Sequence, residues 1–357
     1  MTPEDLRAAV AAGLVTEAQA ASITALADSR SGRRAAMQAE DEPFEFFRGF
    51  SEIFISIGLV ILLTGVSLML TWFGGFGLLV AVPLITAAIA WWWAGYFTLR
   101  RRMTLPSMVL ASAFGAGLMI FIVTLLGQSG LDERMVGVLA FALSAAGMLL
   151  WYRRFKLPFA AFLTGLLVLG MIYAITASTA NLIALASGGN GWDRLFDLTE
   201  SPAFATATLL FGIGAFLVGM WFDTRDPHRL GRHAATAFWC HLLAAPALVN
   251  TVAVTLLNSG GGTGIALLSL ALFVITMLAL VIDRRSFLTA AIAYIALVIS
   301  WVAGDSGDFG TWIFVLIVLG SLITAIGTWW VQLRAFVMKA LPDFPGKHRL
   351  PPYARPE

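Results

Sequence analysis

Long apolar segments alternate with short polar gaps through most of this chain, and most of the Lys and Arg residues lie in every second gap or in the two terminal regions. Each apolar segment is about 17 to 24 residues long, and a helix rising 1.5 Å per residue needs roughly 20 residues to cross the hydrocarbon core of a bilayer. Only 12% of the residues are charged, whereas a soluble domain has about 25%. The sequence therefore predicts an all-α, polytopic transmembrane helical bundle and excludes a soluble fold.

Ten segments have the length and apolar character of a membrane span. They cover residues 53–72, 76–97, 106–127, 135–151, 157–178, 203–222, 234–257, 262–282, 287–303 and 311–330. Together they predict a ten-span transmembrane domain over residues 53–335.

The distribution of Lys and Arg predicts the orientation of these spans. All of these residues except Arg134 and Arg194 lie in alternate gaps or in the two terminal regions. Cytoplasmic loops retain Lys and Arg during insertion, so both termini are expected to face the cytoplasm.

Tryptophans support this placement, because they cluster beside the expected cytoplasmic ends of even-numbered spans, where amphipathic rings anchor a helix in the interface. These are Trp91, Trp92, Trp93, Trp151, Trp221, Trp329 and Trp330. A cation-binding cage made by Trp91, Trp92 and Trp93 is disfavoured, since successive helical residues point about 100° apart.

The first 28 residues predict a small cytosolic helical hairpin. Gly13 marks the exit of the first helix, and Thr16 and Gln19 have the spacing of a capping box for the second. Four acidic residues accompany the single basic residue Arg7, which argues against a DNA-binding helix-turn-helix and any nucleic-acid partner. The hairpin has too few apolar residues for a core of its own, so we expect it to dock on a protein partner.

Three further segments flank the spans. Residues 29–52 predict a polar linker followed by a Phe-rich helix in the inner interface, or by a simple extension of the first span. Residues 336–357 predict a Pro-rich cytosolic tail, which is expected to be extended after Lys339. In the longest outer loop, Trp192, Leu195 and Phe196 have one-face helical spacing. That spacing predicts an interfacial helix serving as a lid or anchor, or as a contact for a partner.

The string GLVTEAQAASI at residues 13–23 precedes a polar linker and a Gly-containing first span that ends at Trp72. This arrangement resembles the domain-of-unknown-function 2157 family of bacterial membrane proteins, over roughly the first quarter of the chain. The resemblance implies an integral membrane protein with a small cytosolic N-terminal module, located in a bacterial inner (plasma) membrane, and it implies no site residue.

Polar groups inside a bilayer are costly and are retained mainly for a purpose. His241 is the ionisable residue predicted at depth, about 11 Å from the cytoplasmic end of its span at 1.5 Å per residue. Pro246 leaves one backbone carbonyl of that helix without its donor, and Asn250 lies on the face opposite His241. These three residues form the candidate intramembrane site. His241 could bind a substrate or relay a proton, or could lock packing through a neighbouring helix.

The sequence favours neither an enzyme nor a cofactor. The string GQSG at residues 127–130 is similar to the nucleophile motif of rhomboid proteases, but Ser129 is expected at the outer surface, far in depth from His241. The other histidines, His228, His233 and His348, lie at or beyond the inner boundary and do not suit haem. No HExxH motif, Cys cluster or phosphate-binding loop indicates a metal or nucleotide.

Two classes of function remain. The first is a structural, assembly or sensory membrane component that acts through protein or lipid interactions. The second is a ten-span transporter or exporter of a small neutral or lipid-like molecule, built from inverted five-helix repeats. A glycine spacing of seven recurs in the first, sixth and tenth segments, at Gly58 and Gly65, Gly212 and Gly219, and Gly320 and Gly327. It suits either a repeat or simple close approach of helices.

Overall fold

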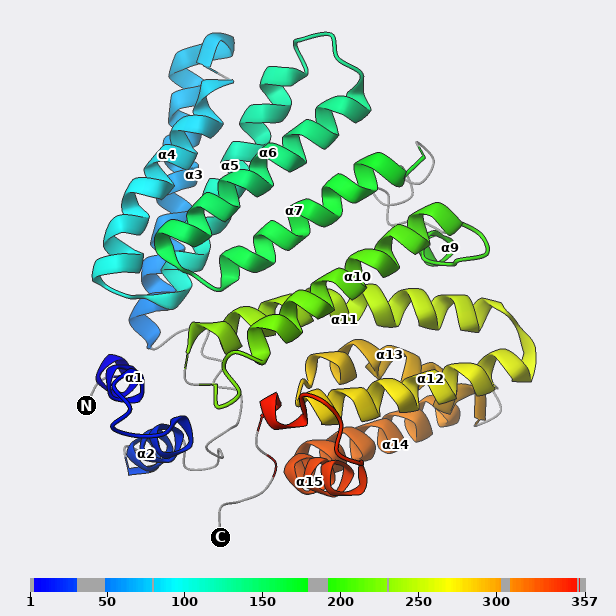
Figure 1. Ribbon diagram of the computed structural model, residues 1–357. Helices are drawn as coiled ribbons and strands as arrows, with labels where there is room; N and C mark the ends of the chain where they lie inside the picture. Colours follow the sequence, from blue (N-terminus) through cyan, green and yellow to red (C-terminus); the bar gives the residue numbers. More distant parts are fainter. Residues whose placement is uncertain are drawn as a thin grey trace. The chain divides into compact units, whose positions relative to one another are not determined.

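The computed structural model describes residues 3–30, 49–78, 80–178, 192–229, 231–302, 309–351 and 353, and its regular elements in these ranges are helices, with no strand among them (Figure 1). Eight helices in the described ranges are long and apolar enough to cross a membrane, or nine if a bent pair near the C-terminus counts as one span. These features confirm the helical membrane class. The chain divides into two compact units, residues 43–178 and residues 1–42 with 179–357, which are described in turn.

The unit of residues 43–178 contains the first five predicted spans. Its elements are α3 (Phe50–Leu78), α4 (Ala81–Ala94), the π-helical turn η1 (Gly95–Arg100), α5 (Thr104–Leu126), α6 (Glu133–Phe155) and α7 (Phe159–Thr176). Helix α3 packs on α4 and α5, and α6 packs on α5 and α7 (Figure 1). The candidate span in α3 ends at Gly75, whose φ of 57° is a backbone conformation that glycine adopts at low cost.

The N-terminal segment forms α1 (Pro3–Ala11) and α2 (Glu17–Arg30). The Thr16 N–H donates to Gln19 Oε1 at 2.9 Å, and the Gln19 N–H donates to Thr16 Oγ1 at 3.2 Å. This reciprocal pair confirms the predicted capping box. The turn between the helices includes Gly13 at φ 70°. Most of the predicted linker, with its phenylalanines at 44, 46 and 47, lies outside the described residues.

The rest of the second unit holds five long helices and several short ones. They are α9 (Trp192–Leu195), α10 (Pro202–Asp223), α11 (Arg232–Asn258), α12 (Gly261–Ile282), α13 (Ser286–Val302), α14 (Phe309–Thr328), α15 (Trp330–Ala340) and the 3-10 turn η2 (Lys347–Arg349). Helix α11 packs on α10, α12 and α13 (Figure 1). Of its apolar window, 56% is buried, against at most 33% for the other candidate spans, so α11 is the central helix of this unit.

The last two predicted spans differ from the other eight. Helix α13 has 17 residues, and the segment predicted as a single span over 311–330 is broken, because α14 and α15 meet at an angle of 71°. The break follows Trp329, and the indole N–H of Trp330 donates to Asp283 Oδ1 at 2.7 Å. Eight predicted spans are therefore confirmed as candidates, and the count of ten stays a prediction.

The C-terminal segment folds back onto the protein, whereas an extended tail was expected after Lys339. Helix α15 continues to Ala340, and the side chains of Leu350 and Pro351 are buried. The Arg334 guanidinium, itself buried, donates to the carbonyl oxygens of Leu280 at 3.1 Å and of Pro351. A buried guanidinium needs acceptors, and the returning chain supplies one of them.

The described end of the outer loop packs inward instead of presenting a free interfacial face. Leu195 and Phe196 are buried, and the Phe196 ring contacts Phe204 edge-on at 5.7 Å between centroids. Asp197 is buried as well, and its carboxylate accepts hydrogen bonds from the Thr199 N–H and Oγ1 at 2.7 Å each and from Asn258 Nδ2 at 2.8 Å. The carboxylate thus holds the segment that precedes α10 to the end of α11.

The pKa of Asp197 gives this contact a pH dependence. Burial alone would raise the pKa, but the hydrogen bonds from Thr199 and Asn258 outweigh burial and hold it below the usual 3.8. The contribution of the carboxylate to stability is therefore complete above about pH 4 and is lost as the pH falls through the native pKa. We expect the unfolding midpoint of Asp197→Asn to lie below that of the wild type at pH 6, and the difference to narrow as the pH falls below about 4. A difference that stays constant with pH would contradict this assignment.

Candidate functional site

His241 lies in a buried cluster with Asp223 and Arg284. Its Nε2 is 2.9 Å from Asp223 Oδ2, and the same oxygen accepts from Arg284 Nε at 3.1 Å. Arg284 Nη2 pairs with Asp223 Oδ1 and also donates to the Ala234 carbonyl at 3.2 Å. The three residues are 0%, 4% and 1% exposed, respectively. The carboxylate is thus held by a guanidinium and an imidazole together.

The cluster lies at the ends of helices. Asp223 is the last residue of α10, and Arg284 lies in the connection between α12 and α13. His241 is well inside α11, so the first turns of α11 extend past the end of α10. The sequence predicted His241 about 11 Å inside its span at 1.5 Å per residue. In the structure it lies level with the end of the neighbouring helix α10, because its hydrogen-bond partner terminates that helix.

Asp283, the residue before Arg284, forms a second set of ion pairs. Asp283 Oδ2 lies 3.0 Å from Arg229 Nη1, and Arg229 Nη2 donates to the Asp283 carbonyl at 2.7 Å. Asp283 Oδ1 accepts from Trp330 and lies 3.8 Å from Arg334 Nε. We call the combined set the ion-pair network: Asp223, Arg229, His241, Asp283, Arg284 and Arg334. It joins α10, α11, α15 and the connection between α12 and α13.

Gly219 of α10 provides the space for the imidazole. A Cβ atom at this position would lie 2.8 Å from His241 Cε1 and 2.9 Å from Nε2, so α10 approaches α11 closely here. A Cβ at Gly212 would similarly lie 2.9 Å from Leu248 Cδ2. In the first and tenth predicted spans, by contrast, a Cβ at Gly58, Gly65, Gly320 or Gly327 would meet nothing within 4 Å. The recurring glycine spacing therefore does not mark a recurring packing role.

The structure does not bring the three sequence-predicted site residues together. The Asn250 side-chain oxygen accepts from the Tyr294 hydroxyl of α13, whereas His241 binds Asp223. Pro246 is exposed, within a helix that is continuous from Arg232 to Asn258. His241 thus links α11 to α10, and Asn250 links α11 to α13.

Sequence reasoning did not find the other two members of this cluster. The charge pattern places Arg284 among the cytoplasmic charges, and Asp223 follows directly after the predicted span 203–222. A usable signal was present, since Asp223, Asp226 and Asp283 interrupt gaps that are otherwise basic. Carboxylates beside helix ends rich in arginine indicate ion pairs between those ends.

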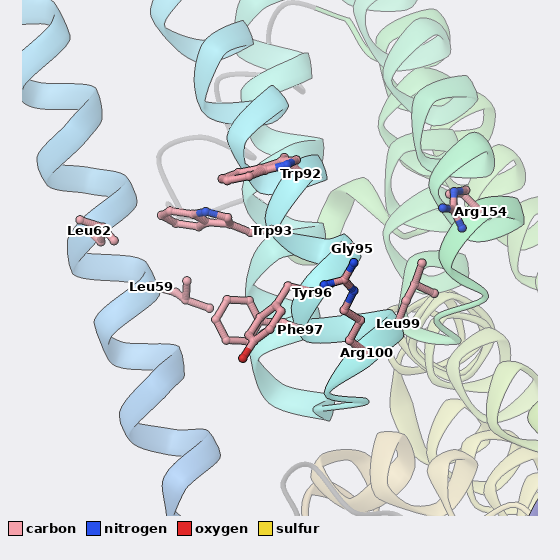
Figure 2. Close-up of a pocket in the computed structure, with 10 residues that line it drawn as sticks. All are labelled: Leu59, Leu62, Trp92, Trp93, Gly95, Tyr96, Phe97, Leu99, Arg100 and Arg154. Atoms are coloured by element: carbon pink, nitrogen blue, oxygen red, sulfur yellow. The ribbon is translucent and has the colours of Figure 1, made fainter.

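A cavity of about 780 Å³ lies in the other unit (Figure 2). Its walls combine aliphatic and aromatic side chains with two arginines. The lining residues are Leu59, Leu62, Trp92, Trp93, Gly95, Tyr96, Phe97, Leu99, Arg100 and Arg154. We call this space the aromatic cavity. Figure 2 shows the two leucines on α3, most of the lining on α4 and η1, and Arg154 on a third helix, α6.

The three successive tryptophans divide between this cavity and the core. Trp91 packs into the core, where its ring lies 4.9 Å from Phe155 and 5.5 Å from Trp151. Trp92 and Trp93 line the aromatic cavity. The three rings therefore do not surround one space, as expected, because Trp91 faces the core while Trp92 and Trp93 line the cavity.

Taken together, these features place the chain in the class of helical, multi-pass membrane proteins. Comparison with known proteins adds no narrower assignment, since no protein-family model, curated protein or solved structure matches the chain.

Proposed function

We propose that this chain is a ten-span protein of the bacterial inner membrane, with both termini cytoplasmic, that acts as a membrane component through contacts with lipid or protein. The observation that carries the proposal is the ion-pair network. Its buried charges bind one another and backbone carbonyls at helix ends, an arrangement suited to fixing helix positions. None of its members lines the aromatic cavity.

The proposal assigns no catalytic role to His241. A general base or proton carrier must reach the group with which it exchanges a proton, and His241 is fully buried between Asp223, Gly219 and the ring of Phe216. Within the described residues, no group of three or more His, Cys, Asp or Glu side chains could hold a metal ion. We therefore favour a non-enzymatic function without a cofactor.

The N-terminal hairpin is the part proposed to meet a protein partner. Leu14, in the turn between α1 and α2, is 78% exposed, and Leu26 of α2 is 60% exposed, which leaves apolar surface for docking. The two helices before the first span also support the proposed relation to the domain-of-unknown-function 2157 family. Deleting residues 1–28 should release a bound protein without lowering membrane abundance.

A reporter-fusion map tests the topology. Fusions at residues 30, 102, 155, 228 and 345 are expected to report the cytoplasm, and fusions at residues 130 and 190 the outer side. A cytoplasmic signal at residue 190 would overturn the ten-span arrangement, since it would require one span more or fewer before that point.

Transport remains the second candidate, because the chain divides between residues 178 and 179 into units that hold five predicted spans each. The packing within the units differs, however. Helix α3 contacts α5, the helix two positions later, whereas the corresponding contact in the other unit is made by the second helix, α11, with α13. Changing His241 to Ala separates the candidates: reduced membrane abundance supports packing, and normal abundance with a lost cell phenotype supports transport.

A further inference from the structure

We infer that the aromatic cavity binds one anionic phospholipid, with the headgroup phosphate at Arg100 and Arg154 and the first part of one acyl chain along Leu59 and Leu62. This inference deepens the proposed function, on which it rests, by naming a lipid class and a site. Both arginines lie in gaps predicted to be cytoplasmic, so the lipid would belong to the inner leaflet.

The walls of the cavity suit the apolar part of a lipid. Leu59 and Leu62 of α3 lie across from the rings of Trp93 and Phe97, as Figure 2 shows. The volume of about 780 Å³ accommodates a headgroup and the beginning of an acyl chain, but not two complete chains. Tryptophan and tyrosine rings favour the depth at which headgroup and chain meet, so this lining matches that depth.

The charge of the cavity selects an anion. Arg100 and Arg154 are exposed, and the lining residues include no acidic side chain. A guanidinium binds phosphate oxygens through two parallel hydrogen bonds, and two guanidinium groups from separate elements can bind one phosphate from two sides. The neighbouring Arg101 is engaged differently, because its Nε donates to the Tyr96 hydroxyl at 2.9 Å.

The space itself comes from the irregular end of the second span. The Arg101 N–H bonds to the Tyr96 carbonyl, five residues back, at 2.9 Å, and the Met103 N–H to the Phe97 carbonyl at 3.0 Å. Such a π-helical turn is rare, and it is frequent at functional sites. Gly95 opens this turn and leaves room, since a Cβ there would meet nothing within 4 Å.

The carboxylate at the start of α3 does not compete for these arginines. Glu52 is buried, and its Oε2 accepts the Thr104 and Leu105 N–H groups at 3.1 Å each, which caps the beginning of α5. Free phosphate would have no use for the apolar walls, so a lipid explains more of the lining than an inorganic ion does.

The test uses full-length protein, delipidated in detergent and titrated with phosphatidylglycerol, phosphatidylcholine or inorganic phosphate, with bound molecules counted by native mass spectrometry. We expect phosphatidylglycerol to bind most tightly. The double variant Arg100→Gln/Arg154→Gln should weaken its binding roughly 30-fold, about fivefold for each lost contact between a guanidinium and the phosphate. The matched control Arg102→Gln/Arg153→Gln removes the same charge from neighbouring arginines that do not line the cavity and should leave binding within about twofold.

A filling variant separates the site from general charge attraction. Gly95→Leu keeps every arginine but occupies the cavity, and it should abolish the preference for phosphatidylglycerol while the unfolding midpoint stays unchanged. Equal losses in the cavity and control pairs, or phosphate binding as tight as lipid binding, would overturn the inference. Lipid that is retained by both cavity variants would overturn this site and leave the proposed function intact.

Discussion

Replacing Asp223 by Asn should lower the free energy of unfolding by roughly 3 to 5 kcal/mol, the largest single effect we expect in this chain. The change keeps the volume of the side chain and removes its charge. Arg284 then remains buried without its carboxylate, and His241 loses the acceptor that orients its ring. Chemical unfolding in detergent micelles, monitored by the emission wavelength of tryptophan fluorescence, measures the difference.

Two comparisons isolate the ion pair. Asp343→Asn removes a carboxylate that is 99% exposed and paired with Lys347, so it should change stability by less than about 1 kcal/mol. The double variant Asp223→Leu/Arg284→Met removes both charges and should recover much of the loss, since an unpaired buried charge costs more than none. If Asp223→Asn were as stable as Asp343→Asn, the buried pair would not be a structural element.

Replacing Gly219 by Ala should cost about 2 kcal/mol, because the new methyl group would occupy the position of the His241 ring. The imidazole cannot turn aside freely, since Asp223 holds its Nε2 at 2.9 Å. Helix α10 must therefore move away from α11, or the hydrogen bond must break. Thermal unfolding of the purified variant measures the loss.

Gly214 provides the matched control in the same helix. A Cβ at this position would meet nothing within 4 Å, so Gly214→Ala should be neutral or slightly stabilising through its better helix propensity. Equal losses for the two variants would show that glycine supports α10 through flexibility and not through close approach to His241.

The first eight spans were predictable because they follow from composition and length alone. A segment such as residues 262–282 must cross a bilayer or lie inside a protein whatever its neighbours are, and α12 agrees with it to within a residue. The capping box at Thr16 and Gln19 was equally local, since both hydrogen bonds join residues three apart.

The ion-pair network was not predictable to the same degree. The pairing of Asp223 with Arg284 joins positions 61 residues apart and depends on how far α11 extends past α10. The predicted depth of His241 was measured along its own span alone, so it carried no information about which end of a neighbouring helix lies level with it. The break at Trp329 likewise depends on the contact between Trp330 and Asp283, which no local pattern encodes.

The aromatic cavity escaped prediction for another reason. Tryptophans at the ends of spans predict interfacial anchors, and that pattern carries no information about which rings face a hollow. The distinction between Trp91 in the core and Trp93 in the cavity follows from the packing of α4, and the irregular turn after Gly95 leaves no clear sequence signal.

Native mass spectrometry of the protein, extracted gently from its own membrane, tests the central claim most directly. We predict that each protein molecule carries a stoichiometric phospholipid or protein partner. The variant His241→Ala should be less abundant in the membrane, but each of its molecules should carry the same partner. Loss of a bound protein on deleting residues 1–28 would assign the contact to the hairpin. A small, non-lipid molecule that disappears from His241→Ala at normal abundance would contradict the account and make the chain a transporter.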